Sequence, residues 1–289
     1  MTIIYTTLIT TADLAAHLDD PAWVIFDARF SLAEADRGRR DYARGHLPGA
    51  IYAHLNDDLS GPVTPGHTGR HPLPDVDAVA RFFSQHGVDD HAQVIAYDDA
   101  GGAMAVRVWW LLHWLGHPAA AVLDGGWPKW LTEGRPVTEQ ITARAPRVFV
   151  PHVQSGWWWT SEEVAARRTE AAYKIFDARN ADRYRGENET IDPVAGHIPG
   201  AISAPYAANL NPDGTFKPIE VLRDYYRSLL GSTPPDRAAC YCGSGVTAAH
   251  NILAMVYAGL GTARLYAGSW SEWITDPARP VATGSEQAP

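Results

Sequence analysis

The stretch VIFDAR at residues 24–29 returns as KIFDAR at residues 174–179, an offset of 150. Two longer stretches return in the same order, GHLPGAIYA at 45–53 as GHIPGAISA at 196–204 and LDGGWPKW at 123–130 as YAGSWSEW at 266–273. Their offsets of 151 and 143 are close to the first. Three ordered matches at nearly one spacing indicate a tandem duplication, which fixes the architecture before any single element does.

Each half alternates strand-like and helix-like patterns. The runs WVIFDA, YKIFDA, AQVIAYDD and RAACYC are short and mostly apolar, as in parallel strands that are buried on both faces. Apolar helical stretches follow the last two, AMAVRVWWLLHWLG and GVTAAHNILAMVYAGLG, and each ends in glycine. The stretches TTADL and TSEEV place threonine near the start of a helix. We therefore predict the α/β class, with tandem domains that are each a parallel sheet with helices on both faces.

The chain length also favours two domains, because 289 residues exceed the usual size of one. The segment TARAPRVFVPHVQSG contains prolines and has no hydrophobic period, so we interpret it as a linker. We expect a first domain at residues 1–140, a linker at 141–156 and a second domain at 157–289.

The composition narrows the class of partner. With 46% hydrophobic and 20% charged residues, the chain should form ordinary globular cores. The net charge of −9 argues against a nucleic-acid or membrane-surface partner, and no apolar run is long enough to span a bilayer. The N-terminal sequence lacks the pattern of a secretory signal. Only two cysteines are present, and their C-x-C spacing makes a poor disulfide, so a cytoplasmic location is expected.

Both cysteines lie in CYCGSGVTAAH at residues 240–250. Cys242 directly follows the predicted strand AACY, and GSGVT then leads into a helix, at the edge of the sheet where ligands gather in α/β folds. Gly243 and Gly245 allow successive backbone N–H groups to point inward, and together with the helix N-terminus they stabilise a thiolate. We predict that Cys242 is a catalytic nucleophile. Cys240 lies inside the strand and is expected to be structural rather than a resolving thiol.

The corresponding turn of the first half reads DDAGGAMAV. With the offset of 143, Asp99 occupies the position of Cys242. We therefore expect the first domain to lack the nucleophile and the second domain to be the catalytic one.

The tandem halves with GHIPGA, the loop CGSGVTA and the turn GSWSEW resemble the two-domain rhodanese-like sulfurtransferases over nearly the whole chain. The loop is similar to that of the 3-mercaptopyruvate sulfurtransferases, whereas thiosulfate-using members carry basic residues just after the cysteine. The resemblance implies that the Cys242 thiolate takes sulfur from a small anionic donor and forms a persulfide. The outer sulfur then passes to a thiol such as thioredoxin, or to cyanide, and no cofactor is required.

The resemblance also implies a proton relay. Members that use mercaptopyruvate place a serine in the loop, with a histidine and an aspartate from the other half. Ser244 matches the serine, and His71 in GRHPLP matches the histidine. The aspartate position falls at Asn56, with Asp57 and Asp58 as alternatives. A relay suits this donor because departure of its sulfur leaves an enolate that must be protonated.

The donor's anionic group is expected to pair with arginine, whose planar guanidinium binds carboxylates through two parallel hydrogen bonds. Arg183 in ADRYRG matches the family's substrate arginine, while the family's second arginine falls at Asp192 and leaves thiosulfate open as a donor. Arg179 and its repeat, Arg29, are expected in structural salt bridges. The loop offers only neutral residues, which favours a donor with one carboxylate over the thiosulfate dianion. These loop residues are Gly243, Ser244, Gly245, Val246 and Thr247.

Other classes fit the sequence less well. A cysteine-based phosphatase needs an arginine that closes the loop, and none follows Cys242 as far as His250. No metal is expected, because the spacing of the cysteines and nearby histidines matches no structural zinc pattern. The expected function is transfer of sulfur from 3-mercaptopyruvate to a thiol or cyanide. The alternatives are a thiosulfate:cyanide sulfurtransferase and a non-enzymatic persulfide carrier.

Overall fold

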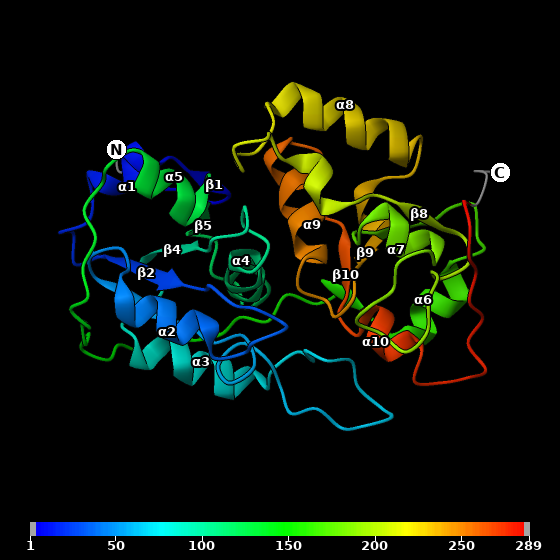
Figure 1. Ribbon diagram of the computed structural model, residues 1–289, viewed down its shortest axis with the longest axis horizontal. Helices are drawn as coiled ribbons and strands as arrows, with labels where there is room; N and C mark the ends of the chain where they lie inside the picture. Colours follow the sequence, from blue (N-terminus) through cyan, green and yellow to red (C-terminus); the bar gives the residue numbers. More distant parts are fainter. Residues whose placement is uncertain (1–3, 286–289) are drawn as a thin grey trace. The chain divides into compact units, whose positions relative to one another are not determined.

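Two five-stranded sheets with the same strand order organise the chain (Figure 1). The computed structural model describes residues 4–285. Its backbone contacts group residues up to Gly61, 73–155 and 211–216 into a first unit, and 62–72, 156–210 and 217 onward into a second. Residues 62–72, from the first half of the sequence, thus belong to the second unit, and residues 211–216, from the second half, belong to the first. Domain boundaries drawn along the sequence do not include this exchange of segments.

The first unit contains a wholly parallel sheet of order β1-β5-β4-β2-β3. Ile25 packs on one face with Leu14 and Trp130, which come from α1 and α5. Phe26 faces the other way, toward Phe82 and Phe83 of α3. The strands are β1 (Leu8–Ile9), β2 (Trp23–Asp27), β3 (Ala50–Tyr52), β4 (Gln93–Tyr97) and β5 (Ala120–Leu123). The helices are α1 (Thr11–Ala15), α2 (Arg37–Arg44), α3 (Val76–Gln85), α4 (Ala105–Trp114) and α5 (Gly126–Thr132).

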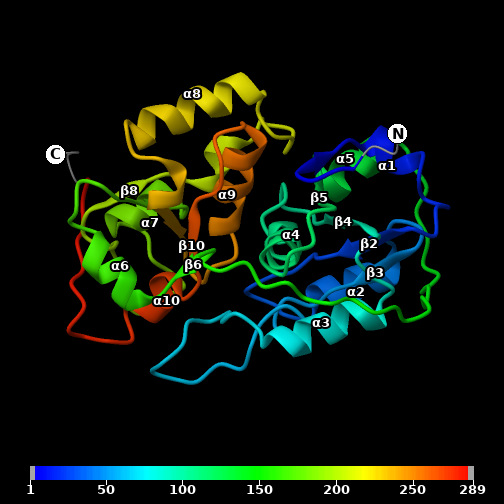
Figure 2. The same ribbon diagram turned by 180° about the vertical axis from the view of Figure 1, so that it is seen from behind.

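The second unit repeats this arrangement with the order β6-β10-β9-β7-β8, again parallel throughout. Ile175 shares one core with Val164 of α6 and Trp270 of α10. Figure 2 shows α8 beside α9, which in turn contacts β9. The strands are β6 (Trp158–Trp159), β7 (Lys174–Asp177), β8 (Ala201–Ser203), β9 (Ala238–Tyr241) and β10 (Arg264–Tyr266). The helices are α6 (Ser161–Arg167), α7 (Ala181–Arg185), α8 (Ile219–Leu230), α9 (Ala248–Tyr257) and α10 (Ser269–Trp273), with 3-10 turns η1 (Tyr206–Asn209) and η2 (Pro235–Arg237).

The predicted α/β class, with a parallel sheet and helices in each half, is confirmed. Threonine begins the first helix of each unit, as the sequence indicates. Thr10 accepts the N–H of Asp13 at 3.1 Å, and Thr160 accepts that of Glu163 at 3.2 Å, so an otherwise unpaired donor of each helix is satisfied.

The helices of the structure are short. The longest, α8, has 12 residues. Within residues 4–285, none has the length and apolar character needed to cross a bilayer.

The three repeated sequence stretches meet in one buried cluster in each unit. Arg29 donates to Asp27 at 2.6 Å and to the carbonyl of Gly45 at 2.7 Å, and its guanidinium lies 4.4 Å from the ring centroid of Trp127. These four residues come from the FDAR, GHLPGA and GGW stretches. The structural salt bridges expected for Arg29 and Arg179 are therefore confirmed. The second unit repeats these contacts with Asp177, Arg179, Gly196 and Trp270.

The structure corrects the residue that replaces the cysteine in the first unit. The carbonyl of Asp98 accepts the N–H of Trp127 at 2.8 Å, as the carbonyl of Cys242 accepts that of Trp270 at 3.0 Å. Each accepting residue directly follows the strand, β4 or β9. Asp98, and not Asp99, therefore stands at the position of Cys242. The offset of 143 misplaced it because the first unit has one more residue between the strand and the tryptophan.

Candidate active site

The cysteine loop runs from the end of β9 to the start of α9 and is held by the GSWS turn. The Cys242 N–H donates to Ser269 Oγ at 3.0 Å, and Ser269 Oγ donates to the Tyr266 carbonyl at 2.9 Å. The carbonyls of Cys242 and Gly243 accept the N–H groups of the next two residues of the turn, each at 3.0 Å. Cys242 is a free thiol and is 1% exposed. The predicted nucleophile is thus fixed by backbone contacts on a loop that its own unit organises.

The two loop glycines have different surroundings. Gly245 has a φ of +77°, and a Cβ there would lie 2.1 Å from the Ala267 carbonyl oxygen. Gly243 has no positive φ, but a Cβ would lie 2.7 Å from an Arg70 nitrogen and 3.8 Å from the terminal nitrogens of Arg183. The turn at 245 therefore requires glycine, whereas at 243 the absence of a side chain lets the Arg70 guanidinium approach the loop closely.

Ser244 and His71 are brought together. The Ser244 Oγ lies 2.7 Å from His71 Nδ1, and both residues are buried. His71 belongs to the segment 62–72, which groups with the second unit although its sequence lies in the first half. The adjacent Arg70 N–H donates to Ser271 Oγ at 3.0 Å. The segment thus packs along the turn that holds the cysteine loop.

The residues expected to orient His71 make other contacts. Asp58 accepts the backbone N–H of His54 at 2.7 Å. The Asp57 carboxylate lies 3.0 Å from His54 Nδ1 and 3.3 Å from Arg39. Asn56 is exposed. Asp57 and Asp58 therefore contact His54.

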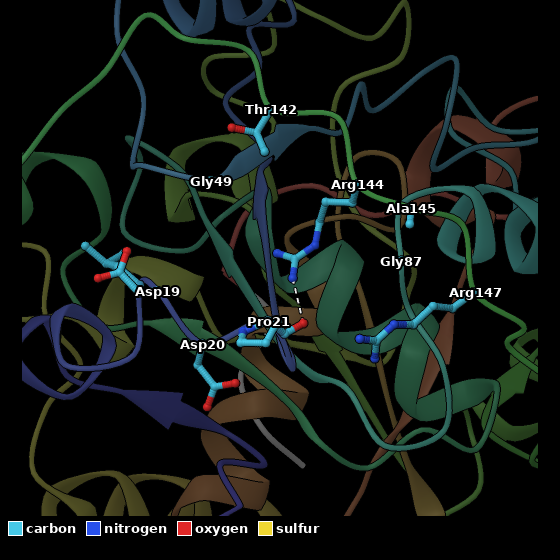
Figure 3. A pocket seen from close by; sticks show the side chains of 10 residues that line it. Asp19, Asp20, Pro21, Gly49, Gly87, Thr142, Arg144, Ala145 and Arg147 are labelled. Carbon is cyan, nitrogen blue, oxygen red and sulfur yellow. Dashed lines mark hydrogen bonds between the residues drawn. The ribbon is translucent and has the colours of Figure 1, made fainter.

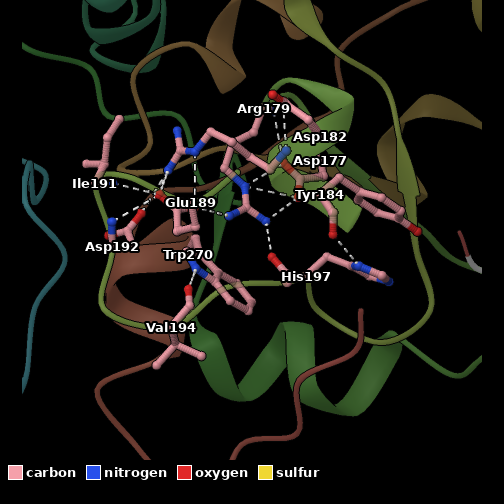
Figure 4. A network of polar contacts seen from close by, with 12 residues as sticks. Asp177, Arg179, Asp182, Tyr184, Glu189, Ile191, Asp192, Val194, His197 and Trp270 are labelled. Carbon is pink, nitrogen blue, oxygen red and sulfur yellow. Dashed lines mark hydrogen bonds and ion pairs between the residues drawn. The ribbon is translucent and has the colours of Figure 1, made fainter. Parts of the chain in front are cut away.

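Arg183 lies beside the loop, but it is paired. Its Nε and a terminal nitrogen donate to the two oxygens of Glu189 at 3.0 and 2.9 Å, and it also donates to Asp192 at 3.0 Å. Figure 4 shows Glu189 and Asp192 within this network. Burial would raise the pKa of Glu189, but N–H donation from Asp192 and Ile191, together with Arg183, lowers it below its usual range. The predicted donor arginine thus carries two carboxylate partners.

Sequence reasoning missed Arg70. It binds the same Asp192 through the other carboxylate oxygen. Its position directly before His71 in GRHPLP was one available signal. The other was the charge change at 192, where the resemblance implies an arginine and this chain has an aspartate.

The remaining candidates occupy ordinary structural positions. Val246 is buried, and Thr247 immediately precedes α9. Cys240 is fully buried in β9, and burial followed by the neighbouring Cys242 raises the pKa of its thiol, so it is held protonated. Across residues 4–285, no group of three or more histidine, cysteine, aspartate or glutamate residues is placed to hold a metal ion.

The corresponding loop of the first unit is filled by its own carboxylate. Asp98 accepts four backbone N–H groups at 2.6–2.9 Å. The neighbouring Asp99 instead pairs with Arg37 at 2.5 Å. The N–H groups of this repeated loop therefore converge on a negative charge at the position that Cys242 occupies in the second unit. The four donors belong to Ala100, Gly102, Met104 and Ala105.

A separate pocket of about 370 Å³ lies in the first unit (Figure 3). Arg144 and Arg147 line it together with Asp19 and Asp20. Arg144 donates to the Pro21 carbonyl at 2.8 Å. None of the predicted site residues lines this pocket, so it has no part in the candidate active site.

The chain is similar to known proteins over most of its length. The model of the rhodanese-like domain matches residues 10–133 and 160–276. The chain is 46% identical to a probable 3-mercaptopyruvate sulfurtransferase of Pseudomonas aeruginosa over 96% of this chain and 98% of the relative. It is 30% identical to the thiosulfate sulfurtransferase of Rattus norvegicus over 94% and 93%. The crystal structure of a 3-mercaptopyruvate sulfotransferase from Escherichia coli matches with a TM-score of 0.80 at 29% identity, over 93% of this chain and 100% of that one.

Proposed function

This chain belongs to the rhodanese-like family and is a sulfurtransferase, and from that premise we propose that it moves sulfur from 3-mercaptopyruvate to a thiol or cyanide through a persulfide on Cys242. The name of the Pseudomonas aeruginosa relative supports this donor. In this proposal Cys242 is the nucleophile, Ser244 and His71 move the proton, and Arg183 binds the donor. The loop amides assist that binding, and they belong to Gly243, Gly245, Val246 and Thr247.

The first step makes one bond and breaks another. The Cys242 thiolate attacks the thiol sulfur of the donor, and the S–S bond of a persulfide forms as the C–S bond breaks. The electron pair of the C–S bond remains on carbon, which gives the enolate of pyruvate. One proton then converts the enolate to pyruvate. In the second step an acceptor thiolate or cyanide attacks the outer sulfur, and the Cys242 thiolate is released.

The observation that carries the choice of donor is the 2.7 Å contact between Ser244 Oγ and His71 Nδ1. It gives the cysteine loop a hydroxyl that is hydrogen-bonded to an imidazole, two residues after the nucleophile. Such a pair can deliver a proton to the pyruvate enolate. Sulfite, the product of thiosulfate, leaves as a stable anion and needs no proton, so the pair has no role with that donor.

The duplicated loop supports a thiolate at Cys242. In the first unit the equivalent backbone holds a carboxylate with four N–H groups at 2.6–2.9 Å. A loop of the same origin is therefore suited to stabilise negative charge on the Cys242 sulfur and on the persulfide that follows.

Thiosulfate is the second candidate donor. Two guanidinium groups lie beside Gly243, and cations favour a dianion. The rat relative that bears the name of thiosulfate sulfurtransferase supports the same possibility. Thioredoxin or another small thiol is the proposed acceptor, and the two free cysteines support a reducing cytoplasm as the location.

Intact mass spectrometry tests the proposal. The protein is exposed separately to 3-mercaptopyruvate and to thiosulfate, and cyanide is then added. We expect a gain of one sulfur atom that is larger with mercaptopyruvate and is reversed by cyanide. Cys242→Ser should lose the gain, and the matched variant Cys240→Ser should keep it.

Each other outcome has a defined meaning. A gain with thiosulfate alone would replace the donor. Equal loss in both cysteine variants would overturn the single-nucleophile mechanism. A gain from neither donor would favour a persulfide carrier that receives its sulfur from another protein.

A further inference from the structure

Arg70 and Arg183 are joined by one buried carboxylate. Asp192 Oδ1 accepts from Arg70, and Asp192 Oδ2 accepts from Arg183 at 3.0 Å. The Asp192 side chain is 1% exposed, whereas those of Arg70 and Arg183 are 30% and 16% exposed. The carboxylate is thus hidden behind two cations that solutes can reach.

Both guanidinium groups lie against the cysteine loop. Arg70 is the nearest neighbour of the Gly243 Cα on the side where a Cβ would point, and Arg183 comes next. The backbone of Arg70 is fixed by the 3.0 Å bond to Ser271 Oγ. The next residue along the chain, His71, contacts Ser244 of the same loop. Arg70 therefore lies next to Gly243, the residue that follows the nucleophile.

Arg70 also has unused donors. Asp192 is the carboxylate that pairs with it. The Nε of Arg70 is buried and has no hydrogen-bond partner among residues 4–285. A guanidinium carries several N–H donors and is always charged, so the partly exposed Arg70 keeps donors beyond its Asp192 contact that can bind an oxygen-bearing anion at the loop.

The charges of this cluster balance. Three cations are opposed by three carboxylates, namely Arg70, Arg183 and Arg179 by Asp192, Glu189 and Asp177. Glu189 already binds Arg183 through both oxygens, so Asp192 is the residue that neutralises Arg70. The negative charges of a donor are therefore repelled by the Asp192 carboxylate nearby, and this repulsion is about twice as large for a dianion as for a monoanion.

We propose that Arg70 binds the donor carboxylate together with Arg183, and that Asp192 restricts the site to donors with a single negative charge. This inference rests on the proposed function and names the donor class for the same site. Arg70 stands in for an arginine at position 192, but it comes from the segment before His71. The aspartate at 192 then serves to hold Arg70 toward the loop and to offset its charge.

Steady-state kinetics with both donors test the proposal. Asp192→Asn keeps the side-chain shape and adds one net positive charge at the loop. It should raise kcat/KM for thiosulfate relative to that for 3-mercaptopyruvate by roughly tenfold. Arg70→Gln should raise KM for both donors by roughly tenfold with a smaller change in kcat. The matched control is Glu187→Gln, which removes a carboxylate that is 57% exposed and pairs with Arg185 away from this cluster. This variant should leave KM and kcat/KM unchanged for both donors.

A second measurement does not depend on sulfur transfer. In a Cys240→Ser background, the rates at which iodoacetate and iodoacetamide alkylate Cys242 are compared. The ratio of the iodoacetate rate to the iodoacetamide rate reports the charge at the loop, because iodoacetate is an anion and iodoacetamide is neutral. Differences in the access of the two reagents to Cys242 largely cancel in this ratio. The ratio should rise in Asp192→Asn and fall in Arg70→Gln.

The two measurements separate the possible failures. An alkylation ratio that stays constant in both variants, or an unchanged KM in Arg70→Gln, overturns the role of Arg70 and Asp192. An alkylation ratio that changes as expected while neither donor transfers sulfur supports the anion site and overturns the proposed function. If Asp192→Asn does not fold, Arg70→Gln alone still decides, because that side chain is partly exposed.

Discussion

Ser244 Oγ lies 2.7 Å from Nδ1 of His71, on the loop that begins with Cys242. The contact joins a residue late in the sequence to one from the segment 62–72, and both lie in the second unit. The nucleophile and the proposed proton donor are therefore held by the same packed structure. A change at either residue of the pair should affect proton transfer without removing the nucleophile.

Ser244→Ala should separate the two donors. We expect kcat/KM with 3-mercaptopyruvate to fall by about 10²–10⁴, the usual contribution of a positioned acid or base. With thiosulfate the fall should be small, because sulfite leaves without a proton. Steady-state rates with cyanide as a common acceptor measure both, and thiosulfate serves as the control within the same variant.

His71→Gln should reproduce this pattern, since the hydroxyl then loses its imidazole partner. An equal loss with both donors in Ser244→Ala and His71→Gln would show that the pair shapes the loop rather than moving a proton.

The arginines of the two FDAR repeats should carry much of the stability of their units. Arg29→Ala leaves Asp27 buried without its cation, and Arg179→Ala does the same to Asp177. Each change should lower the free energy of unfolding by about 3–5 kcal/mol. Urea denaturation followed by tryptophan fluorescence measures it. Arg37→Ala, which breaks two partly exposed ion pairs with Asp41 and Asp99, should cost no more than about 2 kcal/mol. Similar losses in all three variants would contradict the structural role.

Asp98 and Asp99 form a matched pair for the first-unit loop. Asp98→Ala leaves four backbone N–H groups without their acceptor, so we expect a loss of roughly 3 kcal/mol or more in the free energy of unfolding. Asp99→Ala breaks one contact with a partly exposed Arg37 and should cost about 1 kcal/mol or less. The same denaturation measurement decides. A larger loss of unfolding free energy in Asp99→Ala than in Asp98→Ala would contradict the assignment of Asp98 to the position of Cys242.

The sequence predicted the fold because its repeated stretches share one physical purpose. Arg29 contacts a carbonyl of one repeat and a ring of another, so FDAR, GHLPGA and GGW could not change independently. The cysteine loop could also be predicted from the sequence, because the end of a strand, two glycines and the start of a helix are all local features. The structure requires glycine at 245, where φ is +77° and a Cβ would meet a backbone oxygen.

The sequence could not predict which residues that are distant along the chain lie close together in space. A constant offset cannot reveal where one residue has been added, so it places Asp99 rather than Asp98 at the position of Cys242. Order along the chain also does not reveal on which unit a loop packs, and the segment 62–72 joins the second unit. Arg70 was missed for this reason, since its contact with Asp192 joins residues that no local pattern relates.

The imidazole of His113 makes the stability of the first unit depend on pH. Burial lowers the pKa of His113 to about 4, against some help from the carbonyls of Ala120 and Thr6. Between about pH 6.5 and pH 4 the unfolded chain therefore binds a proton that the folded chain does not, so stability falls as the pH falls through this window.

From about pH 7.5 to about pH 5, this group alone should remove about 2 kcal/mol from the free energy of unfolding. Urea denaturation at the two pH values measures the loss in the wild type and in His113→Gln, which cannot titrate but can still donate a hydrogen bond. The variant should lose less stability on acidification than the wild type, by about that amount. His91→Gln, at an exposed histidine, is the control and should behave as the wild type does. If His113→Gln shows the same loss as the wild type, acid sensitivity in this range comes from other buried groups.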